Sequence, residues 1–245
     1  MEIKRLKSAL KSQTALLSAN AIIFAILSGL AASSQSWIWI AIYCIYLIYA
    51  YFKFLKNDAL KQTALFITFA VLSYSALIST ENSSAFLAVI LVSSILFFIF
   101  LGAQLFYFPH TKAALGIFYH TVIFGIAAYF ASVAPLELWW GALPLFFVVV
   151  YFCTKDYLKF ETGNFDRRKK MYALAFSFLA MQCIWIASLL PFGFLNAALI
   201  VLVFSIICND LFLANFSGKL TYRLLTLNTA FFLGFVALIF IAGSL

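Results

Sequence analysis

Long apolar runs separated by short polar breaks cover almost the whole chain. After Lys11, the next Asp, Glu, Lys or Arg is Lys53. About 20 apolar residues cross a hydrocarbon core of ~30 Å, so this gap predicts two membrane-spanning helices with a turn at residues 33–36 between them. Continued along the chain, the same pattern predicts nine spans, near residues 14–32, 37–54, 62–80, 85–107, 113–134, 138–153, 171–190, 193–214 and 223–244.

The connections between these spans are short, apart from residues 154–170, so we expect a polytopic, all-α transmembrane bundle that forms one domain over residues 1–245. A repeated motif bears on its arrangement. Gln13-Thr14-Ala15-Leu16 recurs as Gln62-Thr63-Ala64-Leu65, which is typical of stacked helical hairpins in parallel orientation. The alternative is that helices drawn from so apolar an alphabet look alike by chance.

Composition excludes a soluble protein, because 66% of the 245 residues are hydrophobic and only 10% are charged. The four cysteines lie in or beside apolar runs without the spacing of a metal site. We interpret them as small core residues, and we expect neither a metal nor a cofactor.

The basic residues predict an orientation. If the N-terminus is cytoplasmic, all 16 Lys and Arg fall at cytoplasmic ends of the nine spans, whereas Glu81 and Glu137 fall outside. We therefore expect a multi-pass protein of the plasma (cytoplasmic) membrane with Leu245 outside. The first span is long for a signal peptide, and we expect it to be retained. Its small residues recur every four positions and predict close packing on another helix: Ala21, Ala25, Gly29 and Ser33.

The net charge of +8 is explained by this orientation and does not indicate a nucleic-acid partner. The lipid bilayer is the expected partner, and a homo-oligomer or other membrane proteins remain open as further ones. One basic stretch is a candidate site for lipid headgroups, with an acidic protein as the alternative: Arg167, Arg168, Lys169 and Lys170.

Four polar residues within the spans lie at a similar depth, roughly 6–11 Å from their cytoplasmic ends at ~1.5 Å per residue. They form the candidate intramembrane site: Asn20, His120, Asp210 and Asn228. Polar groups at this depth are costly unless they pair or meet water, so we expect His120 and Asp210 to face the bundle interior. The alternatives are that Asp210 reaches the headgroups or pairs with Lys219 or Arg223, and that His120 only bonds a neighbouring helix.

No hydrolase, metalloprotease or phosphate-binding motif is present in the sequence, so no catalytic residue is assigned. The pattern favours a small transporter or channel-like protein, or an integral subunit of a membrane complex. The alternative is a membrane-embedded enzyme that acts on a lipid or isoprenoid, with His120 or Asp210 as the general acid or base.

Overall fold

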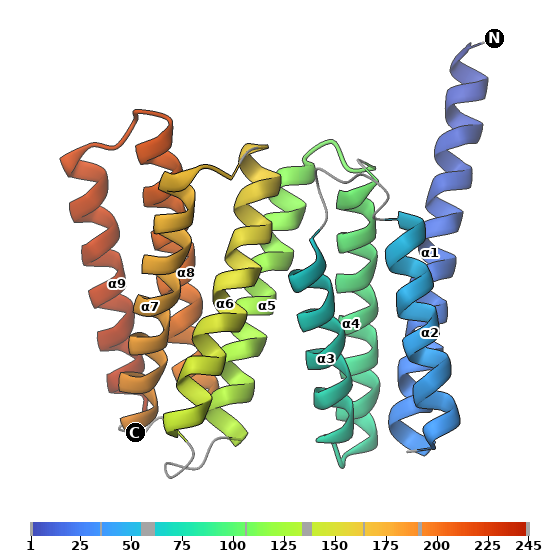
Figure 1. Cartoon of the computed structure of the whole chain (residues 1–245), viewed down its shortest axis with the longest axis horizontal. Helices are drawn as coiled ribbons and strands as arrows, with labels where there is room; N and C mark the ends of the chain where they lie inside the picture. The colour runs from blue at the N-terminus through green and yellow to red at the C-terminus, as the bar shows by residue number, and fades with distance from the viewer. Residues whose placement is uncertain are drawn as a thin grey trace. The chain divides into compact units, whose positions relative to one another are not determined.

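The computed structural model describes residues 2–34, 36–54, 62–105, 107–133, 139–163, 165–190 and 193–243. Every regular element within these residues is an α-helix (Figure 1). The helices are α1 (Glu2–Ser34), α2 (Trp37–Phe54), α3 (Thr63–Ile78), α4 (Ser83–Gln104), α5 (Thr111–Val133), α6 (Trp139–Thr162), α7 (Arg167–Leu189), α8 (Phe194–Phe216) and α9 (Tyr222–Gly243).

By length and composition, eight of these nine helices can cross a membrane. The remaining one, α3, is apolar but has only 16 residues, which is about 24 Å at ~1.5 Å per residue. It nevertheless runs antiparallel to α4, because Gln62 at its start is hydrogen-bonded to Gln104 at the end of α4. The all-α transmembrane bundle predicted from the sequence is confirmed.

Helix α6 extends further than the expected span of residues 138–153. It continues to Thr162 and is followed by Gly163, whose φ of +74° suits a glycine. Asp166 then caps α7, its carboxylate accepting a hydrogen bond of 3.0 Å from the backbone N–H of Lys169. The stretch expected to be a long loop is therefore mostly helix.

The chain divides into two compact units. The first contains α1 to α4 and α5 through Phe118, and the second begins at Tyr119. In the first unit, α1 packs against α2, α3 and α4. Its core is aromatic: the ring of Phe24 lies 4.4 Å from that of Phe97 and 5.7 Å from that of Phe69.

The small-residue ridge of α1 packs as expected. Gly29 is buried, and a Cβ atom at that position would lie 3.0 Å from the Ile90 side chain of α4. Ala21 is also buried and Ala25 is half-buried, whereas Ser33 at the end of the helix is exposed. The ridge therefore packs closely on α4 at Gly29.

In the second unit, each helix from α6 to α9 packs against the next in the chain. Large apolar side chains remain exposed along the outer helices, as a lipid environment allows. In α9 they include Leu227, Leu233, Leu238 and Ile241.

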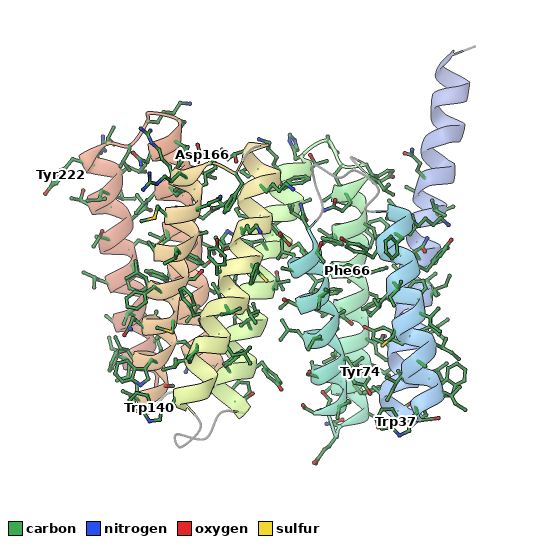
Figure 2. All side chains as sticks on the ribbon, viewed as in Figure 1. Trp37, Phe66, Tyr74, Trp140, Asp166 and Tyr222 are labelled. Atoms are coloured by element: carbon green, nitrogen blue, oxygen red, sulfur yellow. The ribbon has the colours of Figure 1, made fainter. Side chains whose placement is uncertain are left out.

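The two ends of the second unit differ in chemistry (Figure 2). Trp140 is 90% exposed at the end opposite Asp166 and Tyr222. All the described Lys and Arg residues of this unit lie at the Asp166 end, which we call the basic end: Lys155, Lys159, Arg167, Arg168, Lys169, Lys170, Lys219 and Arg223. Glu137, Lys56, Lys61 and the terminal Leu245, which entered the orientation argument, lie outside the described residues.

Candidate functional site

Three hydrogen bonds tie together α5, α6 and α8 in the second unit. His120 Nδ1 lies 3.0 Å from Ser205 Oγ, joining α5 to α8. The Tyr119 hydroxyl lies 2.9 Å from Thr154 Oγ1, joining α5 to α6. Each of the three helices is linked to the other two, because the Asn209 amide of α8 donates to the Tyr157 hydroxyl of α6 at 3.0 Å. We call these six residues the polar cluster.

Helical spacing explains how the polar cluster forms. Ser205 and Asn209 are four residues apart, and Thr154 and Tyr157 are three apart, so each pair lies on one face of its helix. On α5, the ring of Tyr119 stacks on that of Tyr157, with centroids 4.3 Å apart and an angle of 9° between the planes. This stack brings α5 and α6 together beside the hydrogen bonds.

Burial distinguishes one member of the polar cluster from the rest. Tyr119, Thr154, Tyr157, Ser205 and Asn209 are all buried, whereas His120 is half-buried. Its Nδ1 is bonded to Ser205, and the described residues offer Nε2 no hydrogen-bond partner. His120 is thus the least buried member of the polar cluster.

The polar cluster lies toward the basic end of the second unit. Ser205 precedes the end of α8 by 11 residues and Tyr157 precedes the end of α6 by five. At ~1.5 Å per residue these distances are roughly 16 and 8 Å. Tyr157 lies among the charged residues of the last turns of α6, whereas Ser205 lies within the apolar part of α8.

The structure places the two ionisable residues of the candidate site differently. His120 faces another helix, as expected, but Asp210 is exposed. The expectation that Asp210 faces the interior is wrong, because the preceding residue, Asn209, is the one that α8 turns inward. Among the described residues, Asp210 makes no ion pair with Lys219 or Arg223.

The two asparagines of the candidate site lie elsewhere. Asn20 belongs to the first unit, where its backbone carbonyl accepts a hydrogen bond of 2.7 Å from the Tyr46 hydroxyl. Its side-chain amide donates to the carbonyl of Leu16 at 2.6 Å. Asn228 is half-buried on α9 and takes no part in the three hydrogen bonds of the polar cluster.

The candidate headgroup site separates into exposed and buried members. Arg167, Arg168 and Lys170 are exposed in the first turn of α7. Lys169 is buried, and its Nζ atom lies 5.8 Å from the centroid of the Phe216 ring. Three of the four cations are therefore open to an anionic partner.

Sequence reasoning missed three members of the polar cluster: Tyr119, Thr154 and Tyr157. Tyr119 adjoins His120, and Thr154 and Tyr157 share a helical face, but Thr154 and Tyr157 were assigned to a loop because charged residues surround them. In the part of the chain that the structure describes, no group of three His, Cys, Asp or Glu residues is placed to hold a metal ion.

No family model, curated protein or solved structure matches this chain.

Proposed function

We propose that this integral membrane protein is a small transporter or channel-like protein that contacts a polar cargo at the polar cluster. The observation that carries this proposal is the half-buried imidazole of His120, which is held by Ser205 at Nδ1 and has no hydrogen-bond partner at Nε2 among the described residues. An ionisable side chain within a membrane is costly, so a position that keeps one accessible favours function over packing.

Two alternatives receive less support. An enzyme acting on a lipid or isoprenoid would need its general acid and its general base beside the same reacting bond of the substrate. His120 and the exposed Asp210 make no contact with each other. An integral subunit of a membrane complex fits the exposed apolar face of α9. Lipid fits that face equally well. A purely structural role also does not explain why Nε2 of His120 has no partner among the described residues.

The proposed setting is the plasma membrane, with the N-terminus and the basic end of the second unit on the cytoplasmic side. Eight described basic residues gather at that end and Trp140 lies at the other, which matches the preference of Lys and Arg for cytoplasmic connections. The exposed Arg167, Arg168 and Lys170 would then face anionic headgroups.

The first test is ligand binding to the purified full chain. Amino acids, sugars, nucleosides, organic amines and carboxylates are screened by thermal shift, since a ligand at 100 times its Kd stabilises a protein by about 2.7 kcal/mol. We expect one class to raise the Tm of the wild type and of His110→Gln, but not of His120→Gln. His110, the only other histidine, is exposed and provides the matched control.

The second test is uptake of the radiolabelled binding solute by proteoliposomes. We expect uptake above that of empty liposomes, and its loss in His120→Gln. If no class is taken up faster by proteoliposomes than by empty liposomes, the transport proposal is wrong.

A further inference from the structure

The Ser205 hydroxyl bonds differently from those of two other buried serines. Ser93 and Ser177 each donate to the backbone carbonyl four residues earlier in their own helix, at 2.7 Å in both cases. Ser205 is also buried, but the hydrogen bond that the structure gives its hydroxyl is with His120 Nδ1 of α5, at 3.0 Å. The Ser205 hydroxyl therefore joins α8 to the imidazole instead of bonding within its own helix.

One direction of this hydrogen bond satisfies both groups. A serine hydroxyl has one proton to donate, and Nδ1 of a neutral imidazole either donates or accepts. If Nδ1 donated, the buried Ser205 proton would have no acceptor in the hydrogen bonds that join the described residues, which is costly. Tyr119, an alternative acceptor, makes its hydrogen bond with Thr154 at 2.9 Å. If Ser205 donates, Nδ1 accepts and the ring proton lies on Nε2, so the hydrogen bonds favour the Nε2–H tautomer of His120.

This tautomer determines what His120 can bind. A protonated Nε2 can donate a hydrogen bond but cannot accept one. The described residues offer Nε2 no partner, and His120 is the least buried member of the polar cluster. A ligand that pairs with Nε2–H must present an acceptor, such as a carboxylate or carbonyl oxygen. An ammonium group has donors only, so it cannot be the partner.

The charge of the basic end favours a carboxylate over a neutral carbonyl. The eight described Lys and Arg residues of this unit outnumber its four described acidic residues, which are Asp156, Glu161, Asp166 and Asp210. An excess of positive charge raises the local concentration of anions. Hydrogen bonds to an ionised acceptor are also roughly twice as strong as those between neutral groups.

We propose that Ser205 holds His120 as the Nε2–H tautomer, and that this N–H binds the carboxylate of a small organic anion, which is the cargo of the protein. This inference rests on the proposed transport function and adds the chemical class of its cargo. Ser205 acts through His120 and is a positioning residue, whereas His120 contacts the cargo. The contact is a hydrogen bond, so no covalent bond forms or breaks.

The tautomer is measured by solid-state NMR of the full chain in liposomes with ¹³C,¹⁵N-labelled histidine at neutral pH. His110→Gln leaves His120 as the only histidine, and in this background we expect a protonated Nε2 and an unprotonated Nδ1. Ser205→Ala should give a mixture of both tautomers, and Ser205→Thr, which retains a hydroxyl, should restore the Nε2–H form. Ser177→Ala is the matched control, because it removes a buried hydroxyl that is bonded within α7. It should leave the tautomer unchanged.

The cargo class is measured by thermal shift of the purified full chain at constant ionic strength, with chloride as the reference anion. The probes are acetate, benzoate and succinate, each compared with its neutral amide and with benzylamine. We expect at least one carboxylate to raise the Tm, its amide to raise it less, and benzylamine to leave it unchanged. The Kd of that carboxylate should rise about fivefold in Ser205→Ala, the factor that one neutral hydrogen bond contributes. Ser205→Thr and Ser177→Ala should bind it as the wild type does.

The outcomes separate this inference from the transport proposal. A protonated Nδ1 in His110→Gln, or the same tautomer in Ser205→Ala as in the wild type, would overturn the role of Ser205 and leave transport standing. Uptake of an amine, a sugar or a nucleoside by proteoliposomes, but of none of the carboxylates, would overturn the cargo class and also leave transport standing. If no solute of any class enters faster than it enters empty liposomes, the transport proposal and the cargo class are both wrong, and the NMR measurement still decides the tautomer.

Discussion

The pair formed by Asn209 and Tyr157 has a structural role within the polar cluster. Both residues are buried, and the amide of Asn209 donates to the phenol oxygen at 3.0 Å. A buried polar group that loses its partner costs about 1–3 kcal/mol. In membranes the coupling is smaller, averaging about 0.6 kcal/mol with a maximum near 1.7, because the unfolded chain also finds partners.

We therefore expect Tyr157→Phe and Asn209→Leu to destabilise the protein, with a coupling energy of about 0.6–1.7 kcal/mol between them. A double-mutant cycle on unfolding in mixed micelles measures this energy. Tyr222→Phe removes the hydroxyl of a residue that is 82% exposed and should leave stability unchanged. Additive effects of the two substitutions would show that the hydrogen bond contributes nothing.

At the level of residues, the sequence predicts depth better than direction. Counting along the helix placed His120 and Asp210 at a similar level, but successive residues of an α-helix differ by about 100° around its axis. Asp210 and Asn209 therefore share a level and face different ways. The partner of His120 is 85 residues away, and only tertiary packing identifies it.

At the level of elements, apolar runs predict where a helix lies in the membrane and not where it ends. All nine predicted spans correspond to helices, yet α6 continues for nine residues beyond the expected boundary at residue 153. Charged residues such as Lys155 and Asp156 end an apolar run, but they do not break a helix. The break comes at Gly163, which adopts a positive φ.

The packing of α1 on α4 gives an element-scale prediction. A Cβ atom at Gly29 would lie 3.0 Å from the flexible tip of Ile90, so Gly29→Ala should cost little. Gly29→Leu overfills the contact and should destabilise the protein by about 1–3 kcal/mol, measured by unfolding in mixed micelles. Gly234→Leu on α9 is the control, because Gly234 is exposed and a Cβ atom there would meet nothing within 4 Å. Equal stability of the two leucine variants would rule out close packing of α1 at Gly29.

At the level of the whole molecule, the number of crossings determines which side each connection faces. Eight helices are long and apolar enough to cross, and α3 is the exception by length. If α3 also crosses, as its antiparallel pairing with α4 favours, Gln62 and Ser83 at its two ends lie on opposite sides of the membrane. The five helices from α4 to α8 separate Ser83 from Ser217 in either case. If α3 does not cross, the connections before and after it lie on the same side of the membrane. Basic and acidic residues are then no longer on opposite sides of the membrane.

Cysteine labelling in intact cells tests this orientation. We expect a membrane-impermeant maleimide to label Ser83→Cys directly and Ser217→Cys only after permeabilisation, because Ser217 follows α8 at the basic end, proposed to be cytoplasmic. Both serines are exposed and nearly isosteric with cysteine, whereas Gly163 is unsuitable because its φ of +74° strains any other residue. The exposed Cys44 and the half-buried Cys183 and Cys208 are first replaced by serine, while Cys153 is buried. Labelling of Ser217→Cys alone without permeabilisation would place the basic end outside and reverse the proposed topology. Labelling of both sites without permeabilisation would mean that one of the helices between them does not cross the membrane.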